Sequence, residues 1–300
     1  MTTNSLRDKR QQEVRIAAAV FLAPTILIML IYIVYPIIDS FITSTVEWNG
    51  RTPRARAAFV GLANWVRLVQ DKTFWFAFRN NIIIMFLSLV FQVPFALGLA
   101  TFLDRIGKKG LIFKVIWFLP YLISSVAIGV LFKFALDANY GLLASIAKAF
   151  GGGGVDLLGN PKVALFTVIG VVCWQYIPFY MVLYIAAYGM IPMELYEAAS
   201  IDGASMGQYF WKIALPMLKP TIISGATISI IGALKYFDLI FVMTGGGPGT
   251  STELMATYMY KTSFVKFNMG YGATVACGMF ILITATALIV VSALNKQTEV

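Results

Sequence analysis

The side chains that could do chemistry gather in three short segments of this 300-residue chain. Lys235 and Asp238 are an acid–base pair three residues apart in a largely apolar run. A second segment, Trp174 to Met181, mixes aromatic rings with one amide. The third, Ile191 to Pro220, is a polar connector. Charges inside an apolar run are costly and usually functional, because little water is present to solvate them.

The groups on which enzymes usually depend are missing. There is no histidine, so the commonest metal ligand and the usual proton shuttle near neutral pH are absent. The glycine-rich stretch from Gly245 to Ser251 lacks the lysine of a nucleotide-binding loop. Cys173 and Cys277 are isolated in apolar runs and give no disulfide framework or metal pair. We expect no catalytic residue, metal or cofactor in this chain.

The composition indicates which elements must position these segments. Hydrophobic residues make up 59% of the chain and charged residues 12%, with a mean hydropathy of +0.79. Soluble domains carry about 25% charged residues, so an ordinary soluble enzyme, a disordered chain and a nucleic-acid module are excluded. The net charge of +9 fits basic ends beside anionic lipid headgroups. We predict an all-α integral membrane protein in contact with lipid and not with nucleic acid.

Six stretches are long and apolar enough to be membrane helices, each of which needs about 20 residues. They cover about residues 16–42, 80–103, 111–136, 163–190, 221–243 and 271–294. The first lacks a small-residue cleavage site and should remain as an anchor. We divide the chain into a tail (1–15), the first span with its connector (16–76), a core of five spans (77–294) and a second tail (295–300).

Basic residues orient the spans only weakly. Arg and Lys are dense in the first 15 residues and in the connector 104–110, which favours the cytoplasm for both. The connector 43–79 carries nearly as many basic residues as these two segments together. Since short basic segments beside spans count most, we place both termini in the cytoplasm and the connector 43–79 outside.

The polar connector 191–220 predicts a helix, a sharp turn and a second helix on the cytoplasmic face. Pro192 suits the first turn of a helix. Asp202-Gly203 ends that helix, because glycine adopts a left-handed conformation freely. Ser205 and Gln208 have the spacing of a capping box that starts the second helix. We expect Pro216 and Pro220 to interrupt that helix before the fifth span.

This connector resembles the EAA loop of the permease subunits of ABC importers. The matching positions are Glu197-Ala198-Ala199, then Gly203 after three residues, then Ile213, Leu215 and Pro216. The resemblance implies the type I ABC importer permease fold with six transmembrane helices. It also implies a coupling helix that docks on an ATPase subunit, with contacts from Glu197, Ala198, Ala199, Asp202 and Gly203. Small alanines can seat closely in a groove, Glu197 offers a charge, and Gly203 permits the turn. The alternative is that Gly203 only ends the helix and that Ala198 and Ala199 pack inside the chain.

Other segments are similar to the carbohydrate-uptake, maltose-type branch of that family. They are Lys235 to Thr250, Phe118 to Ser125 and Trp174 to Met181. The resemblance implies a multi-pass protein of the plasma (inner) membrane that imports a sugar or sugar derivative. Its implied partners are a second homologous permease, a dimeric ATP-binding subunit that holds ATP and magnesium, and an extracytoplasmic solute-binding protein. ATP and the loaded binding protein would favour the outward-facing state through their different affinities for the two states.

Sugars are bound by aromatic faces together with hydrogen-bonding groups. Gln175 and Phe179 are four residues apart and share a helix face, with Tyr176 beside them. By the resemblance these three are sugar contacts, and Ser125 and Tyr236 fall nearby. Packing aromatics, common in membrane proteins, are the alternative.

Lys235 and Asp238 allow two interpretations. Three residues apart on a helix, they can face one another as an intramembrane ion pair. Alternatively, a cationic Lys235 in the cavity would suit an acidic or phosphorylated sugar. They are also the nearest approach to the ion site that a proton- or sodium-coupled secondary transporter would need. That class of transporter, a membrane enzyme and an exporter scaffold are the competing hypotheses, and none of them explains the EAA-type loop.

Overall fold

The computed structural model describes residues 3–152 and 156–295 and is mostly helical. Five of its helices are long and apolar enough to span a membrane, and the number is six when a bent pair of helices is counted as one span. The predicted all-α fold with six spans is therefore confirmed. The chain forms two units, residues 1–70 with 262–278, and 71–261 with 279–300.

The first unit begins with a long helix. Its parts are α1 (Thr3–Met29), a π-helical turn (Leu30–Val34) and α2 (Tyr35–Thr43). The apolar part, Arg15–Thr43, contains the predicted first span. Helix α1 starts at Thr3, so the predicted tail 1–15 is helical in its described part. Side chains along this span are largely exposed, as expected for a helix that faces lipid.

The connector that follows α2 is a small ordered element. Strands β1 (Val46–Glu47) and β2 (Ala58–Phe59) pair antiparallel, and a 3₁₀ turn (Arg54–Arg56) lies between them. Helix α3 (Ala63–Gln70) follows, and its Asn64 amide donates to the carbonyls of Ser44 and Val46.

Three arginines of this connector have partners nearby. Arg54 is 2.5 Å from a carboxylate oxygen of Asp39. The guanidinium carbons of Arg51 and Arg67 lie 4.0 and 4.1 Å from the ring centroids of Phe267 and Tyr271. Such cation–π contacts stabilise arginine beside an aromatic ring. These three arginines stabilise the connector itself. Their number is therefore a poor guide to the side of the membrane on which the connector lies.

The second unit is built on three helices that pack together: α4 (Lys72–Ile106), α8 (Ala164–Tyr188) and α11 (Leu215–Leu234). Helix α8 is the most buried of the candidate spans. Small residues lie where the helices meet, including Ala96 and Ala100 of α4 and Gly225 of α11. Small residues let membrane helices approach closely, which strengthens their van der Waals contact.

Helix α4 starts earlier than the hydropathy predicts, at Lys72 rather than near residue 80. Asp71 is its N-cap, and the side-chain oxygen accepts hydrogen bonds from the backbone of Thr73 and Phe74. Capping satisfies amide groups that the first turn leaves free. The helix ends at Ile106, and a short 3₁₀ turn (Gly107–Gly110) leads to the next span.

Two of the predicted spans are broken helices. The third consists of α5 (Leu111–Leu122) and α6 (Ser125–Ala135), bent by 92° at residues 123–124. The fifth ends at Leu234, three residues intervene, and α12 (Asp238–Met243) follows. The two short helices α6 and α12 pack against each other. The expected single helices over 111–136 and 221–243 are therefore wrong, because buried polar side chains satisfy the broken backbone.

Pro216 and Pro220 do not interrupt the second helix of the polar connector. The chain continues from α10 (Met206–Tyr209) through a π-helical turn (Phe210–Ala214) into α11. Pro216 lies at the start of α11, where a missing N–H group costs little. The π-turn takes up the irregularity and leaves one apolar helical stretch, Met206–Leu234.

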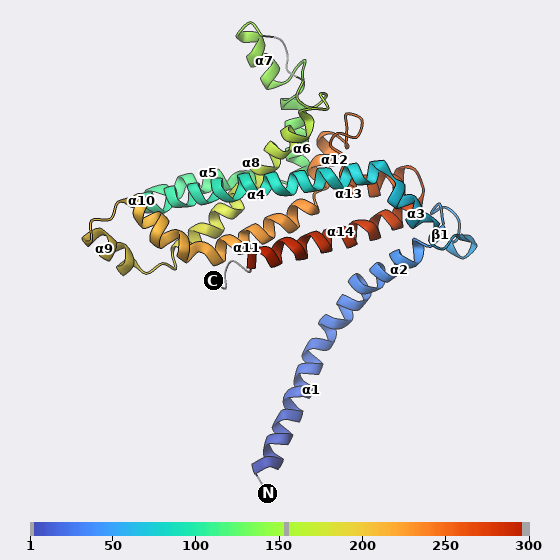
Figure 1. Ribbon diagram of the computed structural model, residues 1–300, viewed down its shortest axis with the longest axis horizontal. Helices are drawn as coiled ribbons and strands as arrows, with labels where there is room; N and C mark the ends of the chain where they lie inside the picture. Colours follow the sequence, from blue (N-terminus) through green and yellow to red (C-terminus); the bar gives the residue numbers. More distant parts are fainter. Residues whose placement is uncertain (1–2, 153–155, 296–300) are drawn as a thin grey trace. The chain divides into compact units, whose positions relative to one another are not determined.

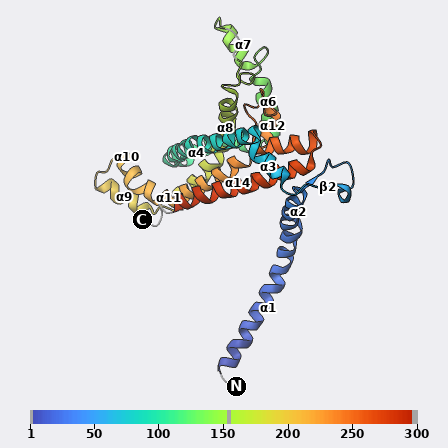
Figure 2. The ribbon, with the colours of Figure 1, turned by 45° about the vertical axis from the view of Figure 1, so that its right-hand side comes forward.

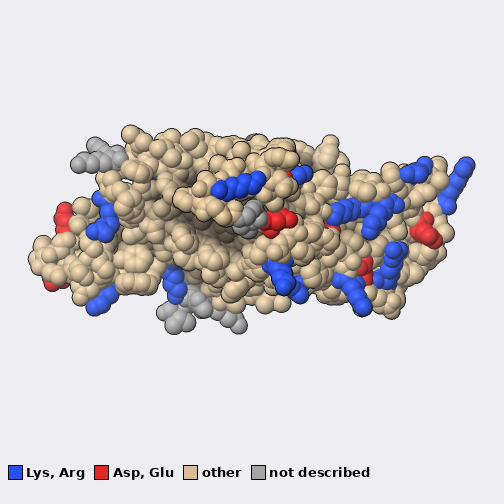
Figure 3. Space-filling view, turned by 90° about the horizontal axis from the view of Figure 1, so that it is seen from above, with Lys and Arg blue, Asp and Glu red and all other residues tan. Residues whose placement is uncertain are grey.

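The remaining elements are short except the last. Helix α7 (Leu142–Ala149) lies in the connector after α6, and α13 (Met255–Tyr260) and a π-turn (Lys261–Val265) follow the glycine-rich loop. Helix α14 (Met269–Asn295) contains the sixth span. Figure 3 shows scattered charged side chains separated by wide uncharged surface, as a lipid-facing protein requires.

Candidate functional site

A cavity of about 310 Å³ lies where the two broken spans meet α8. It is lined by Tyr121, Ser125, Tyr176, Phe179, Tyr180, Ile228, Gly232, Lys235, Tyr236, Phe237, Asp238 and Leu239. Ser125 is the first residue of α6, and Asp238 is the first residue of α12. The breaks therefore bring together side chains that are distant in the sequence.

Aromatic rings make up much of the cavity wall. The ring centroid of Tyr121 lies 5.3 Å from that of Phe179 and 6.0 Å from that of Tyr176. Tyr176 is in turn 5.5 Å from Tyr236. Such a wall offers apolar faces and phenolic hydroxyls together, and it suits a ligand with C–H faces and hydroxyl groups.

Four of the five predicted sugar contacts line this cavity: Ser125, Tyr176, Phe179 and Tyr236. Tyr121 and Phe237 also line it and were missed as site residues. Tyr121 stood in the segment Phe118 to Ser125, whose aromatic and hydroxyl residues were the available signal.

Gln175 does not lie on the cavity wall. Its side chain is 2% exposed, and its Nε2 donates to Ser125 Oγ at 3.1 Å and to the carbonyl of Ile123 at 3.3 Å. The helix-face argument failed here because the break between α5 and α6 presents a free carbonyl group to this amide. Gln175 therefore supports the wall from behind.

Lys235 and Asp238 both line the cavity and are exposed, but no ion pair joins these two described residues. The predicted pairing assumed a continuous helix. Lys235 instead caps the end of α11, and Asp238 begins α12, so the i,i+3 geometry is lost. Each is left facing the cavity as a separate charged group.

The polar connector folds as the predicted helix, turn and helix, at the opposite end of this unit from α12 and α13 (Figures 1 and 2). Helix α9 (Met193–Ile201) is capped by Pro192, which precedes the first helical residue. Gly203 has a φ of +72°, and its N–H donates to the carbonyl of Ser200. Ala204 donates to Ala199, which completes a Schellman turn.

The second helix of this connector starts with the predicted capping box. The N–H of Gln208 donates to Ser205 Oγ, and the N–H of Ser205 donates to Gln208 Oε1 at 2.7 Å. Two amide groups at the helix start are satisfied in this way.

Four of the five predicted docking residues are exposed: Glu197, Ala198, Asp202 and Gly203. Ala199 is 8% exposed and packs inside the chain, so its expected place on a docking surface is wrong. Its small side chain suits the inner face of a short helix. Ile201, by contrast, is 85% exposed and was missed.

A second hollow of about 870 Å³ lies behind α9. Tyr196 and Tyr209 meet edge to face on its wall, with ring centroids 5.2 Å apart. The hydroxyls of Thr101 and Tyr188 are 2.7 Å apart and tie α4 to α8 beside it. Helix α9 therefore stands off the three-helix bundle and exposes its outer face.

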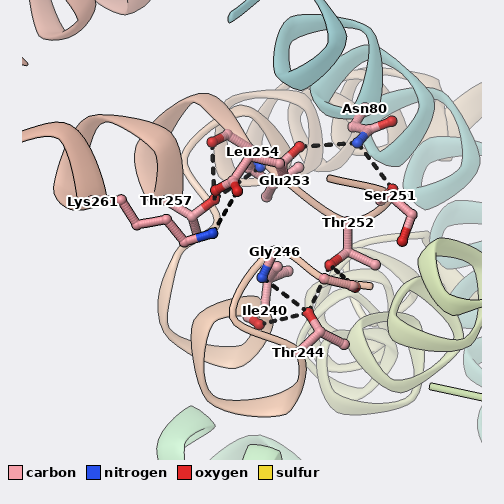
Figure 4. A network of polar contacts seen from close by, with 11 residues as sticks. Asn80, Ile240, Thr244, Gly246, Ser251, Thr252, Glu253, Leu254, Thr257 and Lys261 are labelled. Carbon is pink, nitrogen blue, oxygen red and sulfur yellow. Dashed lines mark hydrogen bonds and ion pairs between the residues drawn. The ribbon is translucent and has the colours of Figure 1, made fainter. Parts of the chain in front are cut away.

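The glycine-rich loop after α12 is held by the polar network of Figure 4. Glu253, 3% exposed, accepts from Lys261 Nζ at 2.5 Å and from Thr257 Oγ1 at 2.6 Å. The Asn80 amide donates to the carbonyls of Ser251 and Glu253. A Cβ at Gly246 would stand 2.6 Å from Glu253 Oε2, so glycine is required there. Hydrogen bonds and an ion pair therefore order this loop.

Residues 92–299 match the protein family described as "binding-protein-dependent transport system inner membrane component". This chain belongs to that family. The permease is 34% identical over 281 residues to the probable ABC transporter permease protein YurN of Bacillus subtilis, covering 91% of this chain and 94% of that relative. It is 32% identical over 298 residues to the lactose transport system permease protein LacF of Rhizobium radiobacter, covering 96% of each chain.

The permease also resembles a solved structure over nearly its full length. A chain from a bacterial ABC transporter involved in the import of the acidic polysaccharide alginate superimposes with a TM-score of 0.80 and 26% identity, covering 98% of both chains. The expected permease fold is thereby confirmed.

Family membership identifies the energy source of transport. The permease is a multi-pass membrane subunit of an ATP-driven, binding-protein-dependent importer. It is not an enzyme, since ATP is hydrolysed by a partner subunit in such systems. The ion-coupled secondary transporter finds no support in these comparisons.

Proposed function

We propose that this permease imports a sugar or sugar derivative through the aromatic cavity at the two helix breaks. The observation that carries the proposal is the lining itself: four tyrosines and two phenylalanines beside Ser125, Lys235 and Asp238. Aromatic faces match the C–H faces of a sugar ring, and the polar groups match its hydroxyls. The lactose permease and the alginate importer above act on a neutral and an acidic sugar, which supports the class.

We propose that α9 is the element that docks on the ATPase. Its outer face presents the carboxylate of Glu197, the small side chain of Ala198 and the apolar side chain of Ile201. The Schellman turn at Gly203 and the capping box at Ser205 stiffen the segment. A stiff segment can transmit a push from a partner into α8 and α11, to which it is joined at either end.

The orientation follows from this docking, and the similarity to the family supports the remaining partners. Helix α9 faces the cytoplasm, both termini lie on the same side, and the connector 43–79 lies outside. The remaining partners are a second, homologous permease that completes the cavity and an extracytoplasmic binding protein that delivers the sugar. Residues 1–2 and 296–300 of the two tails lie outside the described residues.

The test is purification of the tagged permease from its own membrane, followed by mass spectrometry of what accompanies it. We expect an ATP-binding subunit and a second six-span permease. The companion binding protein is then screened by thermal shift against lactose, arabino-oligosaccharides and alginate oligosaccharides. The reconstituted transporter should hydrolyse ATP faster with the binding protein loaded by the sugar that shifts it.

Two variants separate the parts of the proposal. Gly203→Val, which forces a branched side chain into a left-handed conformation, should lose the ATPase during purification, whereas Gly203→Asn should keep it. Tyr176→Ala should keep the ATPase and lose sugar uptake. Recovery of the permease without any ATP-binding subunit would refute the docking proposal, and a binding protein that takes no sugar would refute the substrate class.

A further inference from the structure

Each helix break beside the cavity leaves backbone groups without a helical partner. In a segment surrounded by lipid, a free carbonyl group costs several kcal/mol unless protein satisfies it. At the first break Ile123 has a φ of −81° and a ψ of +138°, so its carbonyl group has left the helical pattern. At the second break α11 ends at Leu234, whose carbonyl group is in the last turn.

A buried amide side chain satisfies each of these carbonyl groups. Gln175 of α8 donates to Ile123 O at 3.3 Å, and Asn81 of α4 donates to Leu234 O at 3.2 Å. The two side chains are 2% and 0% exposed. They come from the pair of unbroken helices, α4 and α8, that pack most extensively on each other.

Each amide also holds the chain beyond its break. Gln175 donates to Ser125 Oγ, on the first residue of α6, at 3.1 Å. Asn81 accepts from the backbone N–H of Met255, the first residue of α13, at 3.0 Å. Gln175 Oε1 has no hydrogen-bond partner among the described residues, so donation by its Nε2 is what orients this side chain. Both residues therefore fasten a broken span to a rigid neighbour.

We propose that Gln175 and Asn81 are positioning residues that set the angle of the α6–α12 pair over the transport cavity. Helices α6 and α12 pack against each other, and a Cβ at Gly129 of α6 would stand 3.0 Å from Val242 of α12. Because the contact is this close, the two short helices turn together. Loss of the hydrogen bonds of either amide side chain therefore reorients both helices and the cavity residues at their first positions.

Two measurements test the proposal, a distance between labels and sugar uptake. Only the uptake measurement rests on the function proposed above. The distance measurement needs no sugar and no knowledge of which sugar is carried. Spin labels are placed at Phe134 of α6 and Phe166 of α8, which are 71% and 56% exposed and lie off the cavity wall. The buried Cys173 and Cys277 are replaced by alanine, and the label distance is measured by pulsed electron resonance on the complete transporter in nanodiscs without nucleotide.

We expect Gln175→Leu and Asn81→Leu each to shift or broaden the distribution of label distances relative to the parent. Gln175→Met should do the same, because its side chain is of similar length and has no N–H group to donate. Ser125→Ala should shift the distribution less than Gln175→Leu, since it loses the bond to Ser125 Oγ but keeps the bond to Ile123 O. Gln92→Leu is the matched control: this amide on α4 is fully buried, its Oε1 accepts from Ser229, and its Nε2 donates to no carbonyl group among the described residues.

The transport readout separates positioning from sugar contact. In proteoliposomes with the loaded binding protein, Gln175→Leu should lower the maximal uptake rate about tenfold, the effect of one lost buried hydrogen bond. The KM for the loaded binding protein should stay within about twofold of the parent value. Loss of uptake in the parent would refute the sugar function and leave the distance result standing.

An unchanged label distance in both leucine variants, with the transporter intact by size-exclusion chromatography, would overturn the proposal. A shift in Gln175→Leu without one in Asn81→Leu would overturn the joint movement of α6 and α12. A shift in Gln92→Leu equal to the shifts in the two other leucine variants would also overturn the proposal. The loss of any buried amide on these helices would then change the label distance.

Discussion

A Cβ atom placed on Gly225 would stand 2.6 Å from the hydroxyl oxygen of Tyr184 and 3.2 Å from the ring. Tyr184 belongs to α8 and is fully buried, and Gly225 belongs to α11. The two helices therefore approach closely at a point where one of them has no side chain. The Tyr184 hydroxyl makes no hydrogen bond among the described residues, so its role here is to fill space.

Gly225→Ala should destabilise the permease by about 1–3 kcal/mol, since overpacking a tight core forces side chains or backbone to move. The measurement is the thermal unfolding midpoint in detergent. Tyr184→Phe removes the nearest oxygen, so the double variant should recover part of the loss. Gly170→Ala on α8 has open space around the added methyl group and should be close to neutral. Equal losses for the two alanine variants would contradict the contact.

Glu197→Lys should weaken the complex with the ATPase and leave the thermal stability of the permease unchanged, because Glu197 is exposed and makes no hydrogen bond to any residue that the structure describes. Reversing a charge at an interface costs several kcal/mol when the partner group is opposite in sign. The measurement is the amount of ATP-binding subunit retained on a tagged permease at two salt concentrations.

Glu194→Lys provides the matched control, since Glu194 is an exposed glutamate on the same helix one turn earlier. The EAA-type motif does not include it. The control variant should retain the ATPase as the parent does. Loss of the ATPase in both variants would show that the net charge of α9, and not the position of Glu197, governs docking.

Lys235 and Asp238 can be tested by exchange, because they line one cavity without pairing. Lys235→Met and Asp238→Asn should each lower uptake of the sugar identified with the binding protein by about tenfold, the effect of losing a charged hydrogen bond. The exchanged double variant, Lys235→Asp with Asp238→Lys, should stay as impaired as the single variants. Uptake restored by the exchange would show that the two charges pair in the working transporter.

Asp137 should make the loop after α6 sensitive to acid. Backbone N–H groups of Tyr140 and Asn139 donate to its carboxylate and hold its pKa below the usual 3.8. A lowered pKa adds stability above the usual value, and this contribution is lost as the pH falls from 3.8 through the lower folded-state value. The amides of residues 139 and 140 should then exchange faster relative to their intrinsic rates.

The control for this loop is Asp137→Asn, whose Oδ1 still accepts both hydrogen bonds but does not titrate. Hydrogen exchange in this variant should show no step between pH 5 and the acid limit. A step of the same size in both proteins would assign the acid effect to another group.

The structure of the polar connector could be predicted from the sequence because its contacts join residues close together in the chain. The left-handed turn at Gly203 and the capping box of Ser205 and Gln208 use residues within a few positions of one another. Residue type and spacing therefore carried most of the information. The exception was Ala199, whose burial depends on which face of α9 meets the rest of the chain.

The residues that line the cavity could be predicted only in part. Ser125, Tyr176, Phe179 and Tyr236 were found from residue type and resemblance. Gln175 was misplaced, because an amide that binds a sugar and an amide that supports a break look alike in a sequence. The prolines at 216 and 220 were also misjudged, since Pro216 lies in the first turn of α11 and Pro220 lies inside that helix without ending it.

Composition, the apolar runs and the EAA-type loop were sufficient to establish a multi-pass permease without a catalytic site, because hydropathy and short-range spacing are properties of neighbouring residues. The places where the third and fifth spans break were decided by the tertiary structure. Apolar sequence continues on both sides of each break, and the groups that stabilise the breaks come from far along the chain, with Gln175 bonding to Ile123 and Asn81 to Leu234. A broken membrane helix is stable only when a folded neighbour supplies the missing hydrogen bonds.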